Sequence, residues 1–194
     1  MMLARVISFI SNPIFIFIAL PFFLVYKTTR DIAAAWIWTI YTLVFLFIFV
    51  SFVLIGVRGK FFSDIDVSNR QQRPILYFAG SVLLILYLII LNILHGPLIL
   101  FITSFGIILG ILIASVINMK IKASVHVAAI SGLITSLSIV YQGYYLLLLL
   151  LIPLIAWSRV KIKRHTVPEV VIGGILGSLL SLIMYFITKF YIFT

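Results

Sequence analysis

The chain alternates between long apolar segments and short polar segments rich in Lys and Arg. Five of the apolar segments have the length of about 20 residues that a membrane-spanning helix needs, and two are shorter. In chain order they are Val6–Tyr26, Ile32–Val57, Ile75–Leu94, Leu98–Asn118, Val127–Tyr141, Tyr144–Trp157 and Val170–Phe193. This pattern predicts an all-α integral membrane protein, a helical bundle of six to seven transmembrane helices.

The two shorter segments flank Gln142-Gly143, and we interpret them as a tight helical hairpin. Two predicted spans then separate the polar stretch Arg58–Pro74 from Met119–His126, and two more separate Met119–His126 from Ser158–Glu169. An even number of crossings puts all three polar stretches on one side of the membrane. The inference depends on the hairpin, because the parity fails if Gln142-Gly143 is buried within a span.

Composition agrees with a membrane protein. Of 194 residues, 64% are hydrophobic and 9% are charged, and the mean hydropathy is +1.34. A soluble domain of this size cannot bury that much apolar surface. We therefore expect a single transmembrane domain over residues 1–194. Because Arg5 is followed by an apolar run without a small-residue cleavage site, we expect the first helix to be retained.

The net charge of +10 changes the expected partners. The cations cluster in short loops between apolar runs, where they suit lipid headgroups, phosphates and membrane topology and not nucleic acid. The chain has no cysteine, and three histidines and four acidic residues leave little material for a metal site. We predict a membrane environment, no nucleic-acid partner, no metal and no other cofactor.

The stretch Ser158–Glu169 combines side chains that suit phosphate chemistry. His165 and Glu169 are four residues apart, about one helical turn if the segment is helical, which stacks them on one face. A carboxylate one turn away can hold one ring N–H of an imidazole and leave the other nitrogen free to attack. Arg159, six residues before His165, adds a planar guanidinium that binds oxyanions bidentately.

This stretch resembles the third signature of the type 2 phosphatidic acid phosphatase superfamily, which also includes vanadium haloperoxidases. That signature reads Ser-Arg, five residues, His, three residues, Asp. Here Ser158-Arg159 is followed at the same spacing by His165 and Glu169, with Glu in place of Asp. A second interpretation stays open, in which the cations are lipid-facing anchors and Thr166 to Glu169 is only a capping box.

The superfamily's first signature, Lys, six residues, Arg-Pro, is matched in part by Arg73-Pro74. The lysine position falls on Asp66, and an acid cannot bind phosphate as lysine would. Arg70, one helical turn before Arg73, could supply the second cation, and Lys60 is a more distant candidate.

The second signature, Pro-Ser-Gly-His, is matched by Ser124 and His126. Val125 replaces the glycine, which makes close approach of the backbone to a phosphate less assured, and Lys122 adds a charge nearby. The three partial matches occur in the family's order. The phosphatase-like core is therefore expected over about residues 58–194.

The resemblance implies a metal-independent phosphatase that works through a phosphohistidine. By this resemblance His165 is the nucleophile, Glu169 orients its ring, and His126 protonates the leaving oxygen. The phosphate-binding residues are Arg73, Arg159 and Ser124 by resemblance, joined by Arg70 and Lys122 as candidates for the missing charge. The expected substrate is a lipid or prenyl phosphate or diphosphate, which reaches the site from between the helices.

Two other classes of function stay open. One is a phosphotransferase that passes the phosphoryl group from the same histidine to another acceptor. The other is a non-catalytic membrane protein that binds anionic lipid, which the losses at Asp66 and Val125 favour. A transporter is less expected, because few polar residues fall in the middle of a span.

The distribution of cations predicts sidedness. Eleven of the fourteen Lys and Arg residues lie on the side of the three polar stretches, and three lie on the other side. Short cytoplasmic loops are the ones enriched in Lys and Arg. The sequence therefore predicts a prokaryotic plasma (inner) membrane protein whose site faces the cytoplasm.

Overall fold

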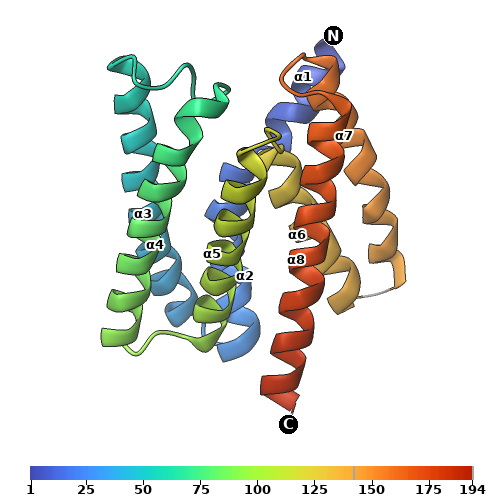
Figure 1. Cartoon of the computed structure of the whole chain (residues 1–194). Helices are drawn as coiled ribbons and strands as arrows, with labels where there is room; N and C mark the ends of the chain where they lie inside the picture. The colour runs from blue at the N-terminus through green and yellow to red at the C-terminus, as the bar shows by residue number, and fades with distance from the viewer. Residues whose placement is uncertain (142, 194) are drawn as a thin grey trace. The chain divides into compact units, whose positions relative to one another are not determined.

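Figure 1 shows the computed structural model, which describes residues 1–141 and 143–193. All regular elements in that part of the chain are helices. The α-helices are α1 (Met2–Ile10), α2 (Pro13–Thr29), α3 (Ile32–Arg58), α4 (Arg73–Ile93), α5 (Leu98–Asn118), α6 (Val125–Tyr141), α7 (Leu151–Lys161) and α8 (Val167–Phe193), and the 3-10 helices are η1 (Arg70–Gln72) and η2 (Gly143–Leu150). Among the described residues, five helical stretches are long and apolar enough to cross a membrane, or six if α1 and α2 form one broken span. The protein is a multi-span helical membrane protein, and the predicted fold class is confirmed.

Pro13 and Pro21 predict kinks in the first span, Val6–Tyr26, which in the structure consists of two separate helices. α1 ends at Ile10 and α2 begins at Pro13. Proline has no backbone N–H and disfavours the helical conformation of the residue before it, which here is Asn12. The Asn12 side chain instead accepts a hydrogen bond from the backbone N–H of Ile14, with an N–O distance of 3.0 Å. Pro21, the other predicted kink, lies inside α2.

The predicted hairpin falls between α6 and η2. Gln142 itself lies outside the described residues, and Gly143 has a left-handed φ of 53°, which glycine adopts at little cost. η2 continues into α7, and the two together make an apolar stretch of 19 residues. Both pack on α6, and the Ser138 hydroxyl donates to the Tyr145 carbonyl oxygen at 2.9 Å. The chain therefore reverses direction after α6, which at 17 residues is short for a full crossing.

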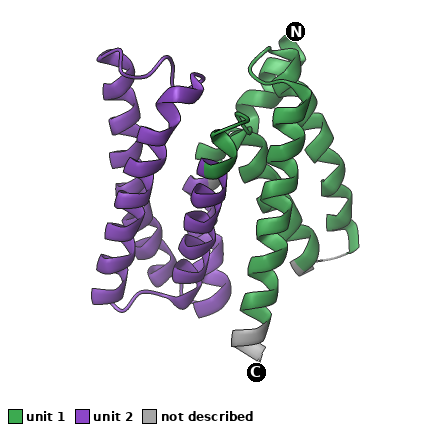
Figure 2. Ribbon diagram, viewed as in Figure 1, with its two compact units in different colours: residues 1–15, 116–194 green, residues 16–115 purple. Residues whose placement is uncertain are grey.

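The chain folds into two compact units, coloured separately in Figure 2. Unit 1 consists of Met1–Phe15 and Val116–Thr194, and unit 2 consists of Ile16–Ser115. Unit 1 therefore joins the first helix of the chain to its last three helices, and it contains two of the three polar stretches that the sequence singled out.

In unit 2, α3 packs against α4, and the polar loop between these helices has a small core of its own. Phe62 and Val67 of the loop are buried together with Val53 of α3. Gly56 on α3 leaves space for the Phe62 ring, which occupies the position that a Cβ atom would take. The loop is thus folded onto the end of α3 and leads into η1 and α4.

In unit 1, the closest packing is between α6 and α8. A Cβ atom on Gly173 would lie 2.5 Å from the Ser124 carbonyl oxygen, and one on Gly177 would lie 1.9 Å from the Ala128 carbonyl oxygen. The two backbones therefore touch, as the small-xxx-small spacing of these glycines predicts. Hydroxyl pairs extend the contact along the helices, with oxygen–oxygen distances of 3.0 Å for Thr135–Ser178 and 3.1 Å for Ser136–Ser181.

We predict that Gly177→Ala destabilises the protein and that Gly174→Ala, on the same helix, does not. The added methyl group at position 177 meets a backbone carbonyl that cannot move aside, whereas at position 174 the nearest atom is 3.7 Å away. Overpacking of this kind costs about 1–3 kcal/mol. Thermal unfolding of both variants in detergent measures the difference, and equal melting temperatures would contradict the close contact.

Candidate functional site

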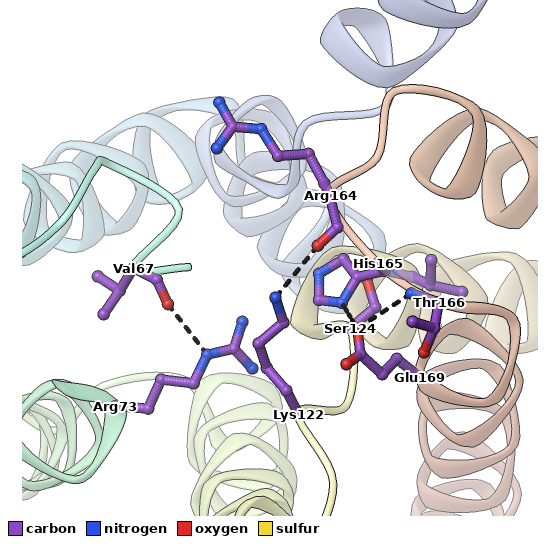
Figure 3. A network of polar contacts seen from close by, with 9 residues as sticks. Val67, Arg73, Lys122, Ser124, Arg164, His165, Thr166 and Glu169 are labelled. Carbon is purple, nitrogen blue, oxygen red and sulfur yellow. Dashed lines mark hydrogen bonds and ion pairs between the residues drawn. The ribbon is translucent and has the colours of Figure 1, made fainter. Parts of the chain in front are cut away.

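Three segments of unit 1 meet at one end of its helices: α1, the start of α6, and the loop between α7 and α8. The backbone N–H of Ser124 donates to the Glu169 carbonyl oxygen at 3.0 Å. The Lys122 ammonium donates to the Arg164 carbonyl oxygen at 3.2 Å, as Figure 3 shows. The structure thus brings the second and third predicted signatures together, although about 40 residues separate them in the sequence.

His165 and Glu169 form the pair that their spacing predicts. The His165 Nδ1 and Glu169 Oε2 atoms are 2.8 Å apart, and the same carboxylate oxygen accepts the backbone N–H of Thr166 at 3.2 Å (Figure 3). The His165 side chain is 5% exposed and the Glu169 side chain 18%. An ionised carboxylate can only accept hydrogen bonds, so Nδ1 carries the hydrogen and Nε2 keeps its lone pair. Glu169 therefore closes the start of α8 and holds the imidazole at the same time.

The surroundings of His165 keep its ring neutral. The pKa of His165 is lowered from 6.5 to about 4; burial is the largest cause, and the nearby Lys122 and Arg159 cations act in the same direction. The hydrogen bond and the negative charge of Glu169 act in the opposite direction. At neutral pH the imidazole is therefore uncharged, with the lone pair that a nucleophile requires.

Arg159 lies in the last turn of α7 and is only 4% exposed. Its Nη1 donates to the Ser8 hydroxyl oxygen of α1 at 2.8 Å. Its backbone carbonyl oxygen accepts the N–H groups of Arg164, at 3.1 Å, and of His165, at 3.4 Å. The loop after α7 is thus folded back on Arg159, and this is what keeps His165 close to it. Ser158 is buried and donates to the Ile155 carbonyl oxygen within α7.

The second signature lies at the start of α6. The Ser124 hydroxyl accepts the backbone N–H of Val127 at 3.4 Å, so it caps the helix. His126 is 7% exposed, and its Nε2 is 3.2 Å from the Ser11 hydroxyl oxygen of α1. Val125, in place of the family's glycine, is exposed, and the close backbone approach at this point comes from Gly173 of α8 instead.

The remaining predicted phosphate-binding residues, Arg70 and Arg73, belong to unit 2. Arg73 begins α4, is 4% exposed, and donates through Nε to the Val67 carbonyl oxygen at 3.1 Å (Figure 3). Arg70 begins η1 and is exposed. Asp66, at the family's lysine position, is exposed, and its backbone N–H donates to the Asp64 carboxylate. The candidate site in unit 1 therefore consists of the other six predicted residues, Lys122, Ser124, His126, Arg159, His165 and Glu169.

Sequence reasoning missed Ser8 and Ser11, which contact two of the predicted site residues. Ser8 lies on α1 and Ser11, three residues later, directly follows the last residue of this helix, so the two lie on one face. In the sequence, these two hydroxyl side chains at a spacing of three were the signal that could have pointed to them. Nothing in the local sequence indicated that their partners lie more than 100 residues away.

The described part of the chain has no group of three or more His, Asp or Glu side chains that could hold a metal ion. Comparison with known proteins adds no relative: no protein-family model, no curated protein and no solved structure matches the chain. Fold and composition together define the class as a multi-span helical membrane protein.

We predict that one histidine of the folded protein stays neutral far below the ordinary pKa of 6.5, down to about pH 4. NMR titration of histidine labelled with ¹⁵N measures this, and the signal is identified by its loss in His165→Asn. In Glu169→Gln the pKa should fall further, because the carboxylate that favours the imidazolium is gone. A value of 6.5 or above for His165 would contradict the described burial.

The same shift has a consequence for stability. Between about pH 6.5 and 4 the unfolded chain binds a proton at His165 that the folded protein does not. The free energy of unfolding should therefore decrease as the pH falls through this window, and His165→Asn should remove that part of the decrease.

Proposed function

We propose that this protein is a membrane-embedded, metal-independent lipid phosphatase that acts through a phosphohistidine at His165. The observation that carries the proposal is the neutral, buried imidazole of His165, held through Nδ1 by Glu169 and placed beside two cations. A neutral imidazole is a competent nucleophile, and fixed cations stabilise the charge that develops on a transferring phosphoryl group.

In the proposed first step, Nε2 of His165 attacks the phosphorus of a lipid phosphate ester. The bond between phosphorus and the ester oxygen breaks with its electron pair on that oxygen, which takes a proton from the imidazolium of His126. The products are a free lipid alcohol and a phosphorylated His165. Glu169 stabilises the positive charge that His165 gains, and Arg159 and Lys122 interact with the phosphoryl oxygens.

In the second step, water attacks the phosphorus while neutral His126 takes one of its protons. The phosphorus–nitrogen bond breaks with its electron pair on Nε2, which releases inorganic phosphate and restores both histidines. Splitting hydrolysis in this way replaces one difficult displacement with two easier ones. Ser124 remains a candidate for a further phosphate contact in this proposal.

A lipid is the substrate class that suits a site of this kind. Ser158–Glu169 covers the end of one apolar helical stretch, Gly143–Lys161, and the start of the next, Val167–Lys189, and thus lies at a membrane boundary. Its cations suit the phosphate group, and the adjoining spans suit an apolar tail. Lipid and prenyl phosphates or diphosphates are therefore the proposed substrates.

A non-catalytic protein that binds anionic lipid is the second candidate function. The observation that favours it is that the Ser124 hydroxyl serves as a helix cap instead of being left for a phosphate. A phosphotransferase would use the same histidine and differ only in the acceptor of the phosphoryl group.

We predict that the purified protein releases phosphate from lipid phosphates in the presence of chelator, and that His165→Ala abolishes this activity. Loss of the nucleophile should lower kcat by at least about 10³-fold, because no covalent intermediate can form. ³²P-labelled lipid phosphate followed by an alkaline quench should leave label on the wild-type protein and none on His165→Ala. His95→Ala, which removes an exposed histidine from the turn between α4 and α5, is the matched control.

Three results would change the assignment. Label on His165→Ala would exclude His165 as the nucleophile. Activity only with an added alcohol as acceptor would favour the phosphotransferase. Tight binding of lipid phosphate without turnover in the wild type would favour the non-catalytic protein.

We further predict that the loop between α7 and α8 faces the cytoplasm, as the excess of cations on its side favours. The chain has no cysteine, so Lys163→Cys introduces a single, exposed thiol in this loop. An impermeant thiol reagent should label it only after the cells are permeabilised. Thr28→Cys, which the order of spans puts on the other side, should be labelled in intact cells, and the reverse pattern would place the loop outside.

A further inference from the structure

The helix α1 packs against α7 within unit 1 and carries two hydroxyls that the proposed mechanism does not use. Ser8 is 6% exposed, and Ser11 lies one turn further on at the end of the helix. Each contacts a site residue, Ser8 the guanidinium of Arg159 and Ser11 the imidazole of His126. The first helix thus reaches the two signatures that lie far along the chain.

The contact with Arg159 has a defined direction. A guanidinium only donates hydrogen bonds, so the Ser8 oxygen is the acceptor of the 2.8 Å bond from Nη1. Both side chains are more than nine-tenths buried, and a long arginine side chain loses much of its rotamer freedom in such a contact. Ser8 therefore holds the guanidinium in one position before any phosphate arrives.

The contact with His126 also has a direction, because Ser11 has a single hydroxyl proton. The Ser11 hydroxyl donates to the Ile7 carbonyl oxygen at 2.8 Å. With its proton directed there, the Ser11 oxygen can only accept from the ring nitrogen 3.2 Å away. This arrangement favours the forms of His126 that carry a hydrogen on Nε2, and the imidazolium is the one of them that donates its proton in the proposed first step.

We propose that α1 is part of the active site, with Ser8 as the positioning residue for Arg159 and Ser11 as the positioning residue that keeps the transferable proton on Nε2 of His126. The inference rests on the proposed phosphatase function and adds two residues to it. In the first step the ester oxygen replaces Ser11 as the acceptor of the Nε2 hydrogen and takes the proton as its bond to phosphorus breaks. His126 is then neutral and ready to receive a proton from water.

Two substrates separate the two roles in the purified full-length protein. A short-chain alkyl lipid phosphate has a leaving oxygen that must be protonated, whereas nitrophenyl phosphate releases a stable anion without a proton. Ser11→Ala should lower kcat about tenfold or more on the alkyl ester, since general acid catalysis contributes about 10²–10⁴-fold, and should change kcat on the nitrophenyl ester little.

Ser8→Ala should act on binding instead. We expect KM for both substrates and the dissociation constant for vanadate to rise about tenfold, the effect of losing a hydrogen bond to a charged group. The ratio of kcat values between the two substrates should stay unchanged. Ser181→Ala, which removes a hydroxyl bonded to the Gly132 carbonyl oxygen away from the site, is the matched control and should leave all three measurements at the wild-type level.

Thr and Val substitutions at Ser8 and Ser11 provide a second test that does not depend on how well the Ala variants fold. Thr and Val have the same shape, so a difference within each pair reports the hydroxyl alone. Thr variants should behave like the wild type, and Val variants like the Ala variants.

The inference would be overturned, and the proposed phosphatase function left intact, if the wild type is active and the Ala and Val variants at Ser8 and Ser11 have the same kinetic constants as Ser181→Ala. If Ser11→Val lowers kcat equally on the alkyl ester and on the nitrophenyl ester, the role of Ser11 in proton transfer is overturned. A wild-type protein that neither releases phosphate nor binds vanadate would instead overturn the proposed function, and the inference with it.

Discussion

The constraint on which the candidate site depends is the position of Glu169 at the start of α8. Its side chain accepts the Nδ1 hydrogen of His165 and the backbone N–H of Thr166, while its backbone carbonyl oxygen accepts the N–H of Ser124. One residue thus fixes the ring of one histidine and ties the beginning of α6, which carries the other histidine, to the beginning of α8. One oxygen of this carboxylate accepts both side-chain hydrogen bonds, so capping α8 and holding the His165 ring do not compete.

This connection is possible because α6 and α8 are in backbone contact. In lipid, helices gain little from burying apolar side chains against one another, so packing and hydrogen bonds between helices have to hold them. Gly173 and Gly177 allow the contact, and the hydroxyl pairs further along the two helices extend it. Gly173 lies directly against the backbone of Ser124, which links the packing of the helices to the geometry of the site. The close backbone approach beside Val125 is therefore made by a glycine of the neighbouring helix.

Much of the fold could be predicted from the sequence, because a bilayer imposes a length on each apolar segment and leaves polar residues for the ends. Leu98–Asn118 was predicted with the bounds of α5, and the pairing of His165 with Glu169 followed from a spacing of one turn. The break at Asn12 was expected only as a kink, because its cause is a local choice between a helical and a side-chain hydrogen bond. The contacts of Ser8 and Ser11 could not be predicted, since tertiary packing of α1 on α7 creates them and no local pattern encodes a partner so far away.

The carbonyl oxygen of Arg159 gives the spacing between Arg159 and His165 a physical meaning. Because it accepts the N–H groups of both Arg164 and His165, the segment between Arg159 and His165 is a ring closed by hydrogen bonds. Its length is set by the geometry of that closure, and Lys163 takes a left-handed φ of 59° to complete it. Side chains within this ring can be exchanged without changing the closure, whereas an added or deleted residue would move His165 relative to Arg159. The interval of five residues between Arg159 and His165 is thus a property of the backbone in this chain.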